Sequence, residues 1–144
     1  MATCVILVYP AGHFIMDIDL NYFLTPERVT LVRLLEKADI PVYVDGVMCE
    51  GAFSGYTVSD VSINSIMVII CLDTLSDYYK SSAILSREIN RTVDHEALHA
   101  AQFCKNEYYP GSVSDDLTTD AELEALSYEG RPQAVGDKLI EFCF

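Results

Sequence analysis

One uninterrupted helical segment constrains the fold of this 144-residue chain more than any other feature. From about Ser81 to Cys104 the sequence contains no Gly and no Pro, the residues that most disfavour a helix interior. Apolar side chains recur near one face of this segment at 3.6 residues per turn; they are Leu85, Ile89, Val93, Ala100 and Phe103. The pattern predicts a long amphipathic helix with one face in the core.

Shorter elements are predicted on both sides of this helix. β-Branched and apolar runs indicate strands at residues 3–9, 42–44, 56–58 and 66–72. An N-cap hydroxyl, a first-turn Pro and an acid at Thr25, Pro26 and Glu27 begin a helix that runs to about Ala38. Two further helices are expected at about 120–129 and 132–142, separated by Gly130 and Arg131. We therefore expect one α+β domain spanning residues 1–144.

The charge of the chain excludes some functions. The formal net charge is −13, so the chain lacks the clustered cations that bind a nucleic-acid backbone or an anionic membrane.

The most apolar run, at residues 66–72, is far too short to cross a bilayer. The apolar start, at residues 1–10, lacks the basic region and cleavage site of a secretory signal. A soluble, cytoplasmic protein is expected.

Cysteine spacing gives no disulfide framework. The five cysteines are odd in number and widely spaced, and no Cys-x-x-Cys occurs. The expectation is therefore free, mostly buried thiols. A bridge such as Cys104 to Cys143 remains an open alternative.

The long helix carries two of the three histidines of the chain. His95 and His99 are four residues apart, so their imidazoles lie on one helix face and can converge on one metal ion. Glu96 points about 100° away around the helix, beside such an ion, where it can hold and deprotonate a metal-bound water. This is the His-Glu-x-x-His arrangement of zinc peptidases.

A catalytic zinc site needs a third protein ligand. The metzincin pattern fails, because Gln102 and Lys105 stand where its Gly and third His would be. The remaining histidine, His13, is expected in a turn far upstream and is a weak candidate. The acids of the next predicted helix, Glu122 and Glu124, are better placed.

At this point residues 81–144 resemble the gluzincin group of zincin metallopeptidases. The resemblance implies that His95, His99 and Glu122 bind one zinc ion and that Glu96 is the general base. It also implies that Ala125, three residues after Glu122, lets the two helices approach closely. Glu124, with Ser127 as its small partner, is the alternative third ligand.

One position departs from the gluzincin pattern. Several members place an Asp or Asn four residues after the ligand Glu, where it orients the first histidine. Leu126 or Tyr128 stands there in this chain, which puts the support of that histidine in doubt.

The resemblance implies a zincin-like α+β fold, with a small mixed sheet packed on the active-site helix and two helices after it. It implies hydrolysis of a peptide or protein substrate by a water that zinc activates and Glu96 deprotonates. Tyr108, Tyr109 and Tyr128 are the nearest candidates to stabilise the oxyanion. The run at residues 66–72 is either a core strand, which its composition favours, or a strand whose exposed edge binds peptide.

Two other functions stay open. The chain can keep the zinc site and the zincin-like fold while being catalytically weak or inactive. Alternatively, a strongly acidic protein can be a binding module that mimics nucleic acid toward a basic protein partner. The second alternative predicts acids spread over one continuous face and no metal.

Overall fold

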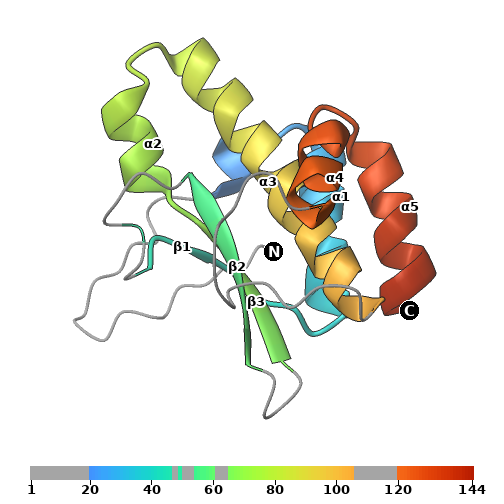
Figure 1. The fold of residues 1–144 in the computed structure, drawn as a ribbon. Helices are drawn as coiled ribbons and strands as arrows, with labels where there is room; N and C mark the ends of the chain where they lie inside the picture. Colours follow the sequence, from blue (N-terminus) through green and yellow to red (C-terminus); the bar gives the residue numbers. More distant parts are fainter. Residues whose placement is uncertain (1–19, 47–48, 50–53, 61–64, 106–119) are drawn as a thin grey trace.

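The computed structural model describes residues 20–46, 49, 54–60, 65–105 and 120–144, which Figure 1 draws in colour. Within them the chain forms a mixed α+β fold with a three-stranded sheet and five α-helices, α1 to α5. The predicted strand at residues 3–9 lies outside the described residues, as do Cys4, His13, Tyr108 and Tyr109. None of the described helices is both long enough and apolar enough to cross a membrane.

The sheet has the strand order β1-β3-β2. β3 (Ser65–Ile70) is the central strand; it pairs in parallel with β1 (Val42–Val44) and antiparallel with β2 (Gly55–Asp60). The sheet is therefore small and mixed, as predicted. β2 pairs along all of β3, and β1 pairs with its residues 68–70. The alternative that residues 66–72 offer an exposed edge to a peptide is therefore wrong for residues 68–70. Leu72 belongs to the next helix.

A short 3-10 turn and two helices precede the long helix in the chain. α1 (Pro26–Lys37) begins after Thr25 as predicted and buries Leu31, Val32 and Leu35. A 3-10 turn, η3 (Leu20–Tyr22), precedes it. α2 (Leu72–Tyr78), which the sequence did not predict, follows β3 directly with Cys71 as its N-cap residue.

The long helix α3 (Ser82–Cys104) is the centre of the fold. Its N-cap residue Ser81 accepts a hydrogen bond from the backbone of Ile84. α3 contacts β2 and β3 on one side, and it contacts α1, α4 (Asp120–Tyr128) and α5 (Pro132–Cys143) elsewhere on its surface. Figure 1 shows α4 and α5 on the side of α3 away from the sheet. The predicted long helix and the two helices after it are thus confirmed.

β2 lies unusually close to α3. A Cβ atom at Gly55 would come 2.6 Å from the Thr92 side chain and 2.9 Å from the backbone oxygen of Ile69. Only glycine therefore permits this approach without a shift of the strand. The approach places the next inward residue of β2, Thr57, against α3 at Glu96.

The expectation of free thiols is wrong for four of the five cysteines. Cys49 forms a disulfide with Cys71, and Cys104 forms one with Cys143, which the sequence had left as an open alternative. The paired Cα atoms are 5.5 and 5.2 Å apart, within the range for disulfides. The paired cysteines are 22 and 39 residues apart in sequence. Pairing over such separations depends on the tertiary fold, so the sequence alone could not establish either bond.

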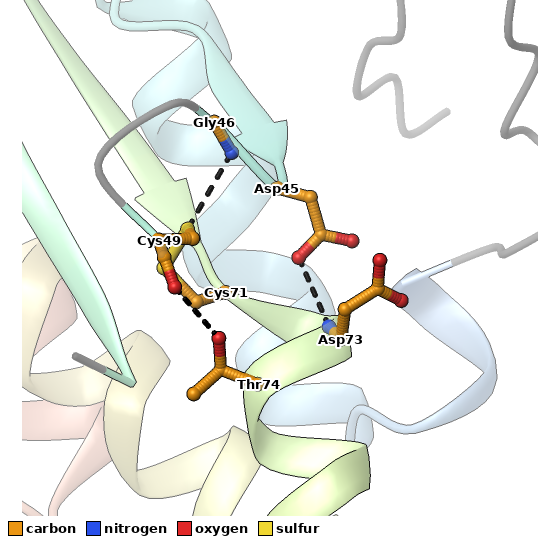
Figure 2. Close-up of a disulfide and its surroundings, with 6 residues drawn as sticks. All are labelled: Asp45, Gly46, Cys49, Cys71, Asp73 and Thr74. Carbon is orange, nitrogen blue, oxygen red and sulfur yellow. Dashed lines mark hydrogen bonds between the residues drawn. A yellow bond between two sulfur atoms is a disulfide. The ribbon is translucent and has the colours of Figure 1, made fainter. Parts of the chain in front are cut away.

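The two disulfides join different parts of the fold. Figure 2 shows Cys49 and Cys71 at the end of the central strand, where Asp45 accepts a hydrogen bond from the backbone of Asp73 at the start of α2. The Cys49 carbonyl accepts another from Thr74. The second disulfide joins the last residues of α3 and α5. Closing loops of these lengths stabilises a fold by about 3–4 kcal/mol each in the chain-entropy model.

Candidate metal centre

The two histidines of α3 lie side by side on the face that meets α4. The ring centroids of His95 and His99 are 4.8 Å apart in an edge-on arrangement. His99 is 4 % exposed, and His95 is partly buried. This is the geometry that a spacing of four residues on a helix predicts.

Glu122 of α4 lies between the two imidazoles. Its Oε1 is 2.7 Å from Nε2 of His95, and its Oε2 is 2.9 Å from Nε2 of His99. One ligand atom from each of the three residues falls within 4.8 Å of the others. Glu124 points to a different partner, the amide of Gln102. The structure therefore brings Glu122, and not Glu124, to the histidine pair.

The close packing of α3 and α4 depends on a small residue. Ala125, one turn after Glu122, is fully buried in the core that α3 shares. A larger side chain there would push the carboxylate of Glu122 away from the rings. The role expected for Ala125 thus agrees with its burial.

The donor set fits a zinc ion. Two imidazole nitrogens and one carboxylate oxygen are a known catalytic zinc ligand set that leaves a fourth position for water. Ligand atoms at 2.0–2.2 Å from zinc in tetrahedral geometry lie roughly 3.3–3.6 Å apart. The two nitrogen-to-oxygen distances at Glu122 would lengthen by about half an ångström to admit the ion.

The other ring nitrogen of His95 is held by a carboxylate that the sequence analysis missed. Nδ1 of His95 is 2.8 Å from Oε2 of Glu129, the residue that follows α4. Arg91, one turn before His95 on α3, donates two hydrogen bonds to the other oxygen of Glu129, at 3.2 and 2.9 Å. Glu129 thus supplies the carboxylate that orients His95, which Leu126 and Tyr128 cannot supply.

Charges around His95 shift several pKa values. Burial would lower the pKa of His95, but hydrogen bonds with Glu122 and Glu129 raise it to about 10. Burial would raise the pKa of Glu129, but His95 and Arg91 hold it below its usual value. The hydrogen bonds with His95 and His99 lower the pKa of Glu122. All three directions show strong mutual attraction between the imidazoles and the carboxylates.

The other ring nitrogen of His99 is held by an amide. Nδ1 of His99 is 2.8 Å from Oε1 of Gln102, one turn further along α3. The amide nitrogen of Gln102 donates to Oε1 of Glu124 at 2.7 Å and to the carbonyl of Ala121 at 3.0 Å. In the sequence, Gln102 was considered only as a mismatch to the metzincin pattern. Its spacing of three residues from His99 could have indicated the contact between the two side chains.

Glu96 is buried between α3 and the sheet. It is 5 % exposed, and its Oε2 accepts a hydrogen bond of 2.6 Å from the Thr57 hydroxyl. Burial raises the pKa of Glu96, and the charges of His99 and His95 oppose that rise.

A buried ion pair anchors the turn that carries Glu129. Asp94 is fully buried and accepts two hydrogen bonds from Arg28 of α1, at 2.8 and 2.6 Å. The same carboxylate accepts a 2.8 Å hydrogen bond from the backbone of Gly130, whose φ of +86° suits glycine. Asp94 thereby holds the residue next to Glu129 against α3.

Of the three tyrosines considered for the oxyanion, only Tyr128 is described. Its ring faces the guanidinium of Arg131, 4.7 Å from the ring centroid. This contact gives the ring a packing role at the end of α4.

Comparison with known proteins identifies one family. Residues 20–110 match the family model described as a domain of unknown function (DUF8637). The matched segment contains His95, Glu96 and His99, whereas Glu122 and Glu129 lie beyond its end. No curated protein and no solved structure matches the chain. Because the match spans 91 of 144 residues, counted from 20 through 110, the chain belongs to the DUF8637 family.

Proposed function

We propose that the chain is a zinc-dependent metallopeptidase with a zincin-like centre. His95, His99 and Glu122 hold one zinc ion, and Glu96 is the general base. One observation carries the proposal: the Nε2 atoms of both histidines meet one carboxylate, while each Nδ1 atom has an acceptor of its own. Metal-binding histidines are typically oriented in this way through their second ring nitrogen.

Each residue has a distinct part in the proposed hydrolysis. Zinc bound here supplies a Lewis acid that activates water and polarises a peptide carbonyl. Glu96 accepts a proton from the attacking water and passes it to the leaving amine. The Thr57 hydrogen bond fixes one oxygen of Glu96, so the carboxylate is oriented before substrate arrives. Glu129 and Gln102 keep the imidazoles directed at the ion.

The burial of the acids near the motif favours this proposal over the acidic binding module. A mimic of nucleic acid presents its carboxylates to solvent. In contrast, Glu96 is 5 % exposed, and the side chains of Glu122 and Glu129 are 14 % and 15 % exposed. All three are hydrogen-bonded within the fold. These carboxylates therefore serve the interior site.

Metal analysis tests the zinc proposal directly. We expect protein purified without chelator to contain about one zinc per chain, measured by mass spectrometry of the metal. His99→Ala removes a ligand and should weaken zinc binding by ~100-fold or more, beyond the effect typical of outer partners. Glu122→Gln should weaken it for the same reason.

The third histidine provides a matched control. His13→Ala removes an imidazole that the proposal does not use, so its zinc content should equal that of the wild type. Wild-type protein that neither contains zinc nor takes it up from a buffered zinc solution would refute the proposal. Equal zinc content in wild type and His99→Ala would refute the ligand assignment.

We further infer that the protein works in an oxidising compartment and not in the cytoplasm first expected. Two disulfides join residues distant in sequence, and such bonds persist where thiols are not kept reduced. Cys71 is fully buried and Cys49 is 8 % exposed, which is typical of a structural bond.

Thiol titration tests this inference. Four cysteines of the described residues pair in the two disulfides. Protein isolated from its native source should therefore show four fewer reactive thiols when it is denatured without reductant than after full reduction. Five reactive thiols would show that the protein is kept reduced and would place it in the cytoplasm.

A further inference from the structure

We propose that Gln102 and Glu124 form a relay that fixes the ring of His99 so that Nε2 is its ligand atom. The inference rests on the zinc site proposed above and adds two positioning residues to it. Glu124, first considered as a rival ligand, has an indirect role in this arrangement. Its carboxylate accepts a hydrogen bond from the Gln102 amide, and the same amide contacts His99.

The orientation of the Gln102 amide follows from its partners. One end of the amide faces the Glu124 carboxylate at 2.7 Å and the carbonyl of Ala121 at 3.0 Å. A backbone carbonyl only accepts hydrogen bonds, so this end must be the NH₂ group. The amide oxygen is therefore the end that faces His99.

The amide orientation decides which ring nitrogen carries a proton. Oε1 of Gln102 can only accept, so Nδ1 of His99, 2.8 Å away, must donate. A neutral imidazole has one N–H and one lone pair. In the structure Nε2 donates to the Glu122 carboxylate at 2.9 Å. When the ion replaces that proton, the proton held at Nδ1 leaves the lone pair at Nε2 for the metal. The relay thus selects the tautomer that can bind the metal.

The relay also fixes the rotation of the ring. Gln102 is 5 % exposed, and its three hydrogen bonds run to α3 and α4. A rotation of the His99 ring would break the Nδ1 contact inside a buried site, which is costly. His95 has a different support, because its Nδ1 faces the carboxylate of Glu129 with Arg91 behind it. The two ligands are consequently held by chemically distinct partners.

A pair of substitutions separates this role from simple packing. Gln102→Met keeps the length of the side chain and removes the acceptor. A cavity of about 20 Å³ adjoins Gln102 and Glu124, so the methyl group can be accommodated. Zinc affinity, measured by chelator competition, should fall by about 10- to 100-fold. Nitrogen-15 NMR of the zinc-loaded variant should no longer show His99 with one fixed Nδ1 proton.

An exchange of the two side chains should restore the relay. Gln102→Glu alone places two carboxylates against each other and should weaken zinc binding. Adding Glu124→Gln supplies an amide that donates to the new carboxylate, which still accepts from His99. Both variants lose the hydrogen bond to the Ala121 carbonyl. The double variant should therefore bind zinc more tightly than Gln102→Glu but more weakly than wild type, a recovery that lost packing would not produce. Circular dichroism verifies that each variant is folded.

Three results have distinct meanings. Wild-type affinity in Gln102→Met, with the Nδ1 proton still on His99, would overturn the relay and leave the zinc site intact. Failure of the folded double variant to recover affinity would overturn the part assigned to Glu124. If the wild type binds no zinc, the proposed function fails. The relay is then tested in zinc-free protein: the NMR signal of the His99 Nδ1 proton should be present in wild type and lost in Gln102→Met.

Discussion

Glu96→Gln will abolish peptide hydrolysis while zinc stays bound. Glutamine has the same shape and can still accept the Thr57 hydrogen bond, but it cannot take a proton from water. A general base contributes about 10²- to 10⁴-fold to rate, so the loss should reach at least that range. Because Glu96 is not among the three converging ligands, the zinc content should not change. Cleavage of a fluorescently labelled unfolded protein and metal analysis of the same sample measure both effects.

An exposed glutamate serves as the control for that experiment. Glu141 is on α5 with a side chain that is 59 % exposed, so Glu141→Gln should leave both cleavage and zinc content unchanged. Cleavage by Glu96→Gln at the wild-type rate would show that another group is the base. A wild type that binds zinc and cleaves no unfolded protein would instead support the catalytically inactive zinc protein.

Arg28→Met will lower the free energy of unfolding by about 3–5 kcal/mol, since it leaves a buried charge without its partner. Asp94 is fully buried and receives both of its ion-pair hydrogen bonds from this one guanidinium. For a domain of this size the melting temperature should fall by roughly 10–15 °C. Urea denaturation of the disulfide-intact protein measures the change. The weakened hold on Gly130 should also reduce zinc affinity through Glu129.

Two variants test the cause of this destabilisation. Arg33 is an exposed arginine on the same helix, so Arg33→Met should change stability by less than about 0.5 kcal/mol. Arg28→Met combined with Asp94→Leu removes both charges and should be less destabilising than the sum of the single changes. If the free energy of unfolding of Arg28→Met lies within about 1 kcal/mol of the wild-type value, the buried Asp94 does not need Arg28 for stability.

The helices were predictable where the sequence marks their ends. Thr25-Pro26 begins α1, Ser81 begins α3, and Gly130 separates α4 from α5. α2 was missed because it follows β3 without a break, and its first residue, Leu72, extends the apolar run of the strand. A short apolar run cannot by itself show where a buried strand ends and a helix begins.

The candidate site was predictable to the extent that it lies on one helix. The spacing of His95 and His99 required only the period of α3. Glu129 was missed because the expected support lay four residues after Glu122, whereas the structure uses the seventh. Glu129 lies just past the end of α4, in a turn that Asp94 holds through Gly130, so helix spacing alone does not reveal it. The disulfides depend on how distant segments meet, which residue spacing does not encode.

The topology also sets an order of maturation. Synthesis proceeds from the amino end, so both imidazoles leave the ribosome before Glu122, which follows His95 by 27 residues. A nascent α3 thus carries both imidazoles of the proposed zinc site before the carboxylate of Glu122 is made. Cys143, 39 residues after Cys104, is made later still. The proposed centre would therefore be completed only when α4 docks on α3, and the disulfide joins the ends of α3 and α5.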